Sequence, residues 1–221
     1  MLLLLLAWAV PALGKKVVPS SPQVTSGSGF FISPDGIIVT GAHVLMGCTT
    51  VSVWPQDGVV RPANVIASDP TLDIAVLWAP GGSTVFATSP DDQEPPPGTT
   101  VFALGYGVLV KNPRQAVPAE GSYIGPAALP SGVAIRLISA DLQHGQSGGP
   151  VVDRYGSLFG MIVGRNGDHG GNGVVLPTPA IASFLAMHNL MLSKHPPQPP
   201  ADPQKLLRAV TVLVQCRPAS G

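Results

Sequence analysis

The sequence has few charged residues, few aromatic residues and no cluster of basic residues. Of its 221 residues, 11% are charged and 5% are aromatic, and 12 basic residues balance 12 acidic ones. The longest basic run is Lys15-Lys16, whereas proteins that bind nucleic acids or anionic membranes usually carry a basic patch. We therefore expect neither kind of partner, while a hydrophobic content of 45% is enough to bury a substantial core.

Cysteine and histidine are also scarce. The only cysteines are Cys48 and Cys216, and the five histidines form no paired pattern with them. Without such spacing the sequence predicts no metal site and no cofactor. In an exported chain the two cysteines favour one disulfide, Cys48 to Cys216, with two buried free thiols as the alternative.

The chain lacks a hydrophobic run long enough to span a bilayer. The apolar run from Leu2 to Val10 is too short for that, and small residues before Lys15 are typical of a signal peptide cleaved after residue 14. An uncleaved N-terminal anchor is the alternative. We expect a secreted or periplasmic protein, with a linker at 15–26 and no membrane contact after cleavage.

Glycine and proline are abundant, with 26 and 25 residues. This composition favours many short strands joined by tight turns. Two apolar runs flank Pro34-Asp35-Gly36 and predict a hairpin. One helix is expected at about 179–192, then a Pro-rich linker at 193–204 and an apolar tail at 205–221 that the pattern leaves undecided between helix and strand.

The segment Gly145-Gln146-Ser147-Gly148-Gly149-Pro150 carries the strongest chemical signal. A serine between glycines can sit on a tight turn with an exposed hydroxyl and free backbone N–H groups, although a glycine-rich surface turn is the alternative reading. Upstream, His43 closes one apolar run and Asp73 opens another, where a buried carboxylate needs a partner. The order His, Asp, Ser is that of chymotrypsin-type proteases.

Residues 27–192 resemble trypsin-like serine proteases, most closely the bacterial HtrA/Deg branch. The resemblance rests on Gly27 to Val53, Asp69 to Leu77 and Gly145 to Val152. It implies an all-β fold of two antiparallel β-barrels, at about 27–90 and 98–178, with a C-terminal helix. Two features depart from the family: the residues after Leu192 are too few for a PDZ domain, and Gln146 replaces the Asp of digestive enzymes that pairs with a new N-terminus.

The residue types predict a serine endopeptidase that cleaves polypeptides. Ser147 is the expected nucleophile, His43 the general base and Asp73 the residue that orients the imidazole, while the N–H groups of Gly145 and Ser147 form the oxyanion hole. Two alternatives are an α/β-hydrolase, which needs a parallel sheet with alternating helices, and a secreted binding module that has lost activity on the same fold. The oligomeric state is left open.

The expected specificity pocket involves Asp141, Val163 and Gly164. In trypsin-like enzymes the residue six places before the nucleophile lies at the pocket base, and a carboxylate there would favour Arg or Lys before the scissile bond. HtrA-like relatives usually have a small residue at that place, which favours a small aliphatic side chain instead. Alternatively, Asp141 caps a turn or pairs with Arg136 at the surface.

Overall fold

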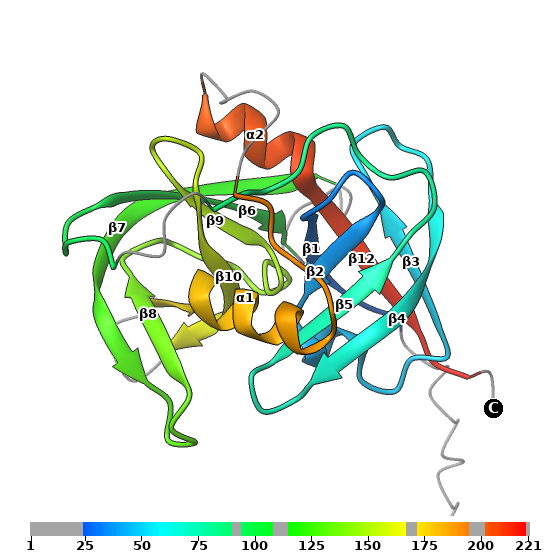
Figure 1. The fold of residues 1–221 in the computed structure, drawn as a ribbon, viewed down its shortest axis with the longest axis horizontal. Helices are drawn as coiled ribbons and strands as arrows, with labels where there is room; N and C mark the ends of the chain where they lie inside the picture. The colour runs from blue at the N-terminus through cyan, green and yellow to red at the C-terminus, as the bar shows by residue number, and fades with distance from the viewer. Residues whose placement is uncertain (1–23, 90–93, 108–114, 167–171, 195–201, 220–221) are drawn as a thin grey trace, which may run out of the picture.

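Two closed antiparallel β-barrels dominate the structure, a computed structural model that describes residues 24–89, 94–107, 115–166, 172–194 and 202–219 (Figure 1). This arrangement confirms the predicted all-β fold of two barrels. Around the first barrel the strands follow the order β1 (Thr25–Phe31), β12 (Thr211–Arg217), β3 (Thr50–Trp54), β4 (Arg61–Asp69), β5 (Ile74–Trp78) and β2 (Ile37–Thr40).

The second barrel comes from the middle of the sequence. Its strand pairs are antiparallel throughout, which excludes the parallel sheet of an α/β-hydrolase. The order is β10 (Leu158–Asn166), β11 (Asn172–Pro177), β8 (Ala134–Ile138), β7 (Ala116–Ala128), β6 (Thr100–Tyr106) and β9 (Pro150–Asp153).

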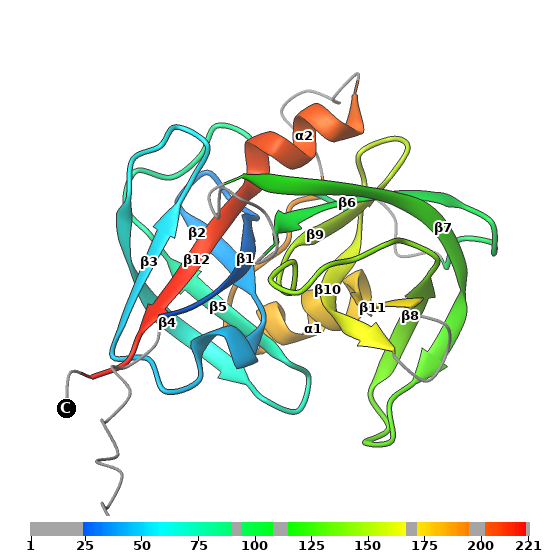
Figure 2. The same ribbon diagram turned by 180° about the vertical axis from the view of Figure 1, so that it is seen from behind.

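The C-terminal strand β12 closes the first barrel. It lies between β1 and β3, so that Val214 is opposite Gly27 on one side and Val53 on the other (Figure 2). The run from Val212 to Val214 is buried and rich in β-branched residues, which suit a packed strand. The first barrel therefore needs a strand from outside the range of about 27–90 expected from the sequence.

The tail that the sequence pattern left undecided contains both a helix and a strand. Helix α2 (Pro203–Val210) precedes β12 directly. Asp202 caps the helix, because its Oδ1 accepts a hydrogen bond of 2.9 Å from the backbone N–H of Gln204, and Pro203 has the fixed φ that suits a first turn. The helix ends at Val210, the first of three consecutive β-branched residues, and Thr211 is its C-cap with an extended backbone.

The helix expected at about 179–192 is shorter in the structure. Helix α1 (Thr178–Met187) buries Ile181, Phe184 and Leu185, which are spaced as one helical face. It ends early because Asn189 adopts a left-handed backbone conformation with φ 58°, which interrupts the helical hydrogen bonds.

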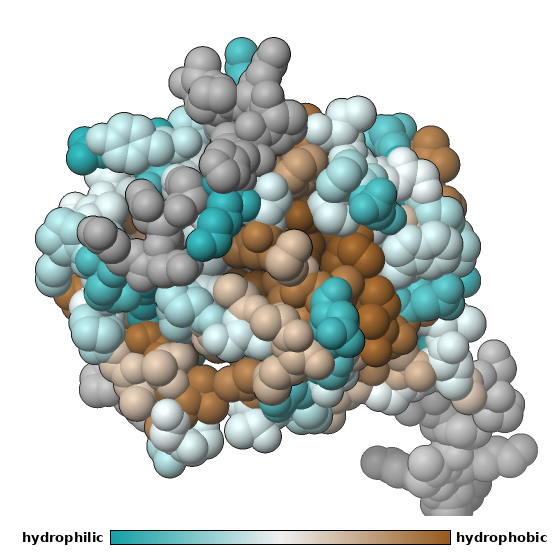
Figure 3. All heavy atoms as spheres, in the orientation of Figure 1, coloured by the Kyte–Doolittle hydropathy of each residue, from teal (hydrophilic) through white to brown (hydrophobic). Residues whose placement is uncertain are grey.

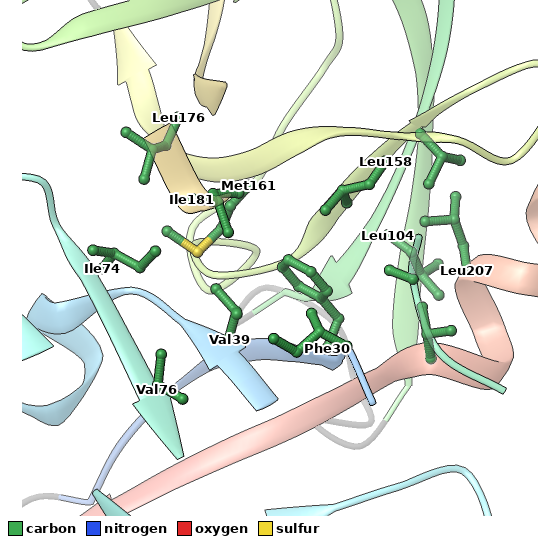
Figure 4. Packing of buried hydrophobic residues seen from close by; sticks show 14 of the residues in the cluster. Phe30, Val39, Ile74, Val76, Leu104, Leu158, Met161, Leu176, Ile181 and Leu207 are labelled. Atoms are coloured by element: carbon green, nitrogen blue, oxygen red, sulfur yellow. The ribbon is translucent and has the colours of Figure 1, made fainter. Parts of the chain in front are cut away.

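The two barrels pack against each other through a shared apolar core. Phe30 and Val39 of the first barrel belong to the same buried cluster as Met161 of the second, and Ile181 of α1 and Leu207 of α2 extend it (Figure 4). On the surface, apolar side chains gather near the middle of the face that carries α1 (Figure 3). Because the cluster spans both barrels, it fixes their relative position, and residues at their junction are held from both sides.

A buried arginine ties the connector between the barrels to the second barrel. Arg136 in β8 is 4% exposed, forms an ion pair with Glu94 and donates a hydrogen bond of 2.8 Å to the carbonyl of Phe159. Tyr123 also donates to Glu94; burial and this bond raise the pKa of Tyr123 to about 12. Burial raises the pKa of Glu94, but the bonds from Arg136 and Tyr123 outweigh it and leave the pKa below its usual value. Arg136 is thus paired with Glu94, and among the described residues no ion pair joins it to Asp141.

Candidate active site

The nucleophile candidate Ser147 lies in the loop between β8 and β9. Gly145 and Gly148 on either side have φ values of 94° and 84°, a region that favours glycine. At Gly148 a Cβ atom would come within 2.1 Å of the carbonyl oxygen of Ser28, so the loop can approach β1 only with glycine there. These two glycines explain the Gly-x-Ser-Gly pattern in physical terms.

His43 and Asp73 come from the first barrel and contact each other. His43 lies in the short 3₁₀ helix η1 (Ala42–Leu45) that follows β2, and Asp73 immediately precedes β5. The carboxylate contacts His43 twice: Oδ1 accepts a hydrogen bond of 2.9 Å from the backbone N–H, and Oδ2 lies 2.7 Å from Nδ1. Asp73 has φ 55°, which is unusual for a residue other than glycine. Two contacts fix both the position and the ring orientation of His43.

The carboxylate also changes the titration of the imidazole. The hydrogen bond that Asp73 accepts from the imidazole raises the pKa of His43, partial burial opposes this, and the negative charge of Asp73 raises the pKa further, so that the pKa lies above the usual 6.5. The His43 side chain remains 44% exposed. A group in this position can accept a proton from one side while Nδ1 remains held on the other.

Ser147 is brought to the same junction by backbone contacts with the first barrel. Its carbonyl oxygen accepts a hydrogen bond of 2.8 Å from the N–H of Ser28, and a Cβ on Gly148 would lie 2.9 Å from the nitrogen of Gly41. Within the described part of the chain, the Ser147 hydroxyl and His43 are not joined by a hydrogen bond. Such bonds are often long in an enzyme without substrate.

The oxyanion-hole candidates have free donors. Among the described residues, no acceptor bonds the backbone N–H of Gly145 or of Ser147. The Gly145 carbonyl instead accepts a hydrogen bond of 2.9 Å from the hydroxyl of Ser28. Two unpaired donors in consecutive tight turns are suited to bind a negatively charged oxygen.

A cavity of about 220 Å³ adjoins Ser147. Leu142 and its neighbours form one side and Ile162 with Gly164 the other; Arg165 bridges the sides by donating a hydrogen bond of 2.8 Å from Nη1 to the carbonyl of Leu142. Gly164, expected from the sequence to contact substrate, lines this cavity. Asp141 is exposed and is not among its lining residues.

A second cavity, of about 200 Å³, lies next to the first. It is lined by Leu72 and Asp73 on one side and by Val163, Gly164 and Arg165 on the other. Val163 therefore faces this neighbouring cavity and not the one beside Ser147. The two cavities share Gly164 and Arg165 and are therefore adjacent along β10.

Two residues at the site have roles that motif reasoning missed. Gln146, noted in the sequence only as the replacement of an Asp, is fully buried; its side-chain amide donates a hydrogen bond of 2.8 Å to the carbonyl of Val117 and its Oε1 accepts one from the N–H of Gln143. Its amide therefore anchors the loop to β7. Arg165 carried no motif signal, and the single clue was a cation directly after the Val163-Gly164 pair.

The structure contains the disulfide between Cys48 and Cys216, with Cα atoms 5.3 Å apart. It joins the segment after η1 to β12. In the described ranges, no group of three or more His, Cys, Asp or Glu side chains is arranged to hold a metal ion. No helix in the same ranges is long and apolar enough to cross a membrane.

Residues 27–161 match the family model described as trypsin-like peptidase domain. This match covers more than half of the chain, and the chain therefore belongs to the trypsin-like peptidases. It is similar to "Serine protease Rv3671c" of Mycobacterium tuberculosis strain H37Rv, with 33% identity over 181 residues that cover 78% of this chain and 44% of that protein. A "Probable periplasmic serine endoprotease DegP-like" of Brucella suis biovar 1 is 33% identical over 173 residues, 76% of this chain and 33% of that protein. The chain spans less than half the length of these relatives.

Solved structures agree with this assignment. The crystal structure of Rv3671c protease from M. tuberculosis in its active form superposes with a TM-score of 0.66 and 25% identity, and covers 85% of this chain and 96% of that chain. The HtrA-type protease AlgW with a decapeptide has the same TM-score at 24% identity, over 74% of this chain and 51% of that chain, and supports the fold. The predicted resemblance to the HtrA/Deg branch is confirmed.

Proposed function

We propose that the chain is a serine endopeptidase that cleaves polypeptides through an acyl-enzyme. Ser147 attacks the scissile carbonyl, His43 accepts the hydroxyl proton and later donates it to the leaving amine, and Asp73 holds the imidazole and stabilises its charged form. The observation that carries this proposal is the double contact of Asp73 with His43, opposite a serine on a constrained turn.

The N–H groups of Gly145 and Ser147 would bind the oxygen of the tetrahedral intermediate. Their lack of acceptors in the described chain supports this role, because a preformed donor pair costs no reorganisation during the reaction. Release of the amine breaks the C–N bond and leaves the acyl group on Ser147. Water, deprotonated by His43, then attacks the ester carbonyl, the bond between this carbon and the Ser147 oxygen breaks, and the acyl group leaves as a carboxylic acid. His43 returns the proton to the Ser147 oxygen, which restores the hydroxyl.

The cavity beside Ser147 would hold the side chain that precedes the scissile bond. Leu142 and Ile162 line its sides. Among the described lining residues, Arg165 is the only one with a permanently charged side chain. A cation at this place disfavours Lys and Arg, and the remaining surface suits a small or medium aliphatic side chain. Cleavage after basic residues, which Asp141 would favour at a pocket base, therefore has less support.

We also propose that the protein acts outside the cytoplasm. The disulfide between Cys48 and Cys216 is stable in an oxidising compartment, and several relatives are named periplasmic endoproteases. Cell fractionation with a cytoplasmic marker enzyme tests this location, and recovery of the protein with the cytoplasmic marker would contradict it.

Labelling with a peptidyl phosphonate tests the proposed reaction. The reagent forms a covalent bond with an activated serine, so the purified protein should gain one adduct, found on Ser147 by peptide mass spectrometry. Ser147→Ala should abolish both the adduct and the hydrolysis of an aliphatic peptide substrate. Ser131→Ala, in an exposed turn, is the matched control and should keep both. A folded wild-type protein that is neither labelled nor active would instead support the inactive binding module.

A further inference from the structure

Ser28 is a fully buried polar residue at the junction of the two barrels. It lies in β1, where its backbone pairs with Leu213 of β12, and its side chain is 0% exposed. Its hydroxyl accepts a hydrogen bond of 2.8 Å from the N–H of Tyr106 in β6 and donates one of 2.9 Å to the carbonyl of Gly145. One hydroxyl from the first barrel thus joins two segments of the second.

The backbone of Ser28 makes two further contacts around the same loop. Its N–H donates 2.8 Å to the carbonyl of Ser147, and its carbonyl accepts 2.7 Å from the hydroxyl of Thr40. Gly148 packs directly over that carbonyl. Ser28 therefore holds the peptide groups that follow both oxyanion-hole residues, Gly145 and Ser147.

The side-chain contact is the one that selects a conformation. Gly145 has φ 94° and no Cβ, so its backbone can rotate into several other conformations at little steric cost. The contacts of Gln146 with β7 fix the next residue, but they leave the Gly145 carbonyl without another described donor. Without the Ser28 hydroxyl, the Gly145–Gln146 peptide keeps one hydrogen bond, of 3.2 Å, from the N–H of Gln146 to the carbonyl of Gln143. A change in the ψ angle of Gly145 then alters the angle between the N–H groups of Gly145 and Ser147.

We propose that Ser28 is a positioning residue, which keeps the oxyanion hole formed by fixing the Gly145 carbonyl across the barrel junction. This inference rests on the proposed function. Ser28 touches no reacting atom and acts through Gly145. Its loss should weaken the stabilisation of the tetrahedral intermediate and leave the His43 and Asp73 contacts unchanged.

Ser28→Ala tests the proposal through the separate measurement of kcat and KM on an aliphatic peptide substrate. We expect kcat to fall about 10- to 100-fold, somewhat less than when an oxyanion-hole donor itself is removed, with KM changed less than threefold. A peptide aldehyde, whose adduct oxygen occupies the oxyanion hole, should bind more weakly by a similar factor. The pH midpoint of the rising limb of kcat should remain unchanged, because His43 is untouched.

The matched control is Thr178→Val. Thr178 is buried and its hydroxyl donates 2.6 Å to the carbonyl of Leu158, away from the nucleophile loop. The Thr178→Val variant should lose about as much thermal stability as Ser28→Ala and keep the kcat and the aldehyde affinity of the wild type. A kcat loss in the control equal to that in Ser28→Ala would show a general structural effect and overturn the positioning role.

Two other outcomes are decisive. If the wild type is active and folded Ser28→Ala has the same kcat, the role of Ser28 is overturned and the proposed function stands. If the wild type is inactive and is not labelled by the phosphonate, the proposed function itself is overturned. If Ser28→Ala does not fold, Ser28→Cys takes its place, since a thiol keeps the shape but donates weakly. It should lose kcat about 3- to 10-fold, and an unchanged kcat overturns the proposal.

Discussion

Replacing Cys48 and Cys216 together with alanine should lower stability substantially and still leave β12 in the barrel. The disulfide closes a loop of 168 positions, and the chain-entropy model assigns about 5 kcal/mol to a loop of this length. Pairing with β1 and β3 and the buried side chains from Val212 to Val214 remain after the change. We therefore expect a folded but less stable protein.

Equilibrium urea denaturation followed by far-ultraviolet circular dichroism measures the effect. With a slope of about 2 kcal/mol per molar urea, a loss of about 5 kcal/mol lowers the midpoint by roughly 2.5 M. The wild-type protein treated with a thiol reductant should unfold at nearly the same urea concentration as the double variant. Val214→Ala is the control, because it removes packing in the same strand and keeps the disulfide.

Equal midpoints for the oxidised wild-type protein and the double variant would refute this prediction. The constraint on the unfolded chain would then contribute nothing measurable. A midpoint lowered as far by Val214→Ala as by the double variant would show that packing in β12, and not the disulfide, accounts for the loss.

Three further predictions concern charged groups. Because Asp73 holds the pKa of His43 above 6.5 and a general base must be neutral, kcat/KM should rise with pH through an apparent pKa above 6.5; a rising limb centred below pH 6 contradicts this. Arg165→Ala should improve hydrolysis after Lys or Arg on the order of tenfold relative to hydrolysis after Val, and an equal change for both substrates rules Arg165 out as the cause. Glu94→Gln should destabilise the protein by about 1–2 kcal/mol at pH 7, measured by thermal denaturation. Since the folded-state pKa of Glu94 is lowered, its contribution is present above the usual value of 4.5 and is lost as pH falls, so the difference should shrink in acid.

Short motifs predicted the fold and the catalytic candidates because their backbone requirements are local. The glycines around Ser147 are needed for positive φ and for the close approach to Ser28, and these requirements are visible in a six-residue segment. The Pro-Asp-Gly turn likewise predicts the hairpin of β1 and β2, which the structure contains. A carboxylate next to a buried strand needs a partner, and this requirement led to the predicted pairing of Asp73 with His43.

Long-range relations could not be derived in the same way. The apolar run in β12 is equally compatible with a helix. It becomes a strand only because it pairs with β1, nearly two hundred positions away, and with β3. Ser28 looked like an ordinary residue at the start of a strand, because its partners Tyr106 and Gly145 are distant in sequence. The place of Arg165 in the cavity depends on its contact with Leu142, which no local pattern encodes.

The position of β12 has a consequence for the time at which the active centre can form. During synthesis β1 to β5 appear first, the whole second barrel follows, and β12 comes after both. Until it arrives, β1 and β3 each present an unpaired edge, which is prone to pair with other chains. The second barrel can close while the first is still an open sheet. The backbone of Ser28 gains its β12 partner only when residues 211–217 are available, so a ribosome-bound chain carries the Ser147 loop without a completed partner barrel.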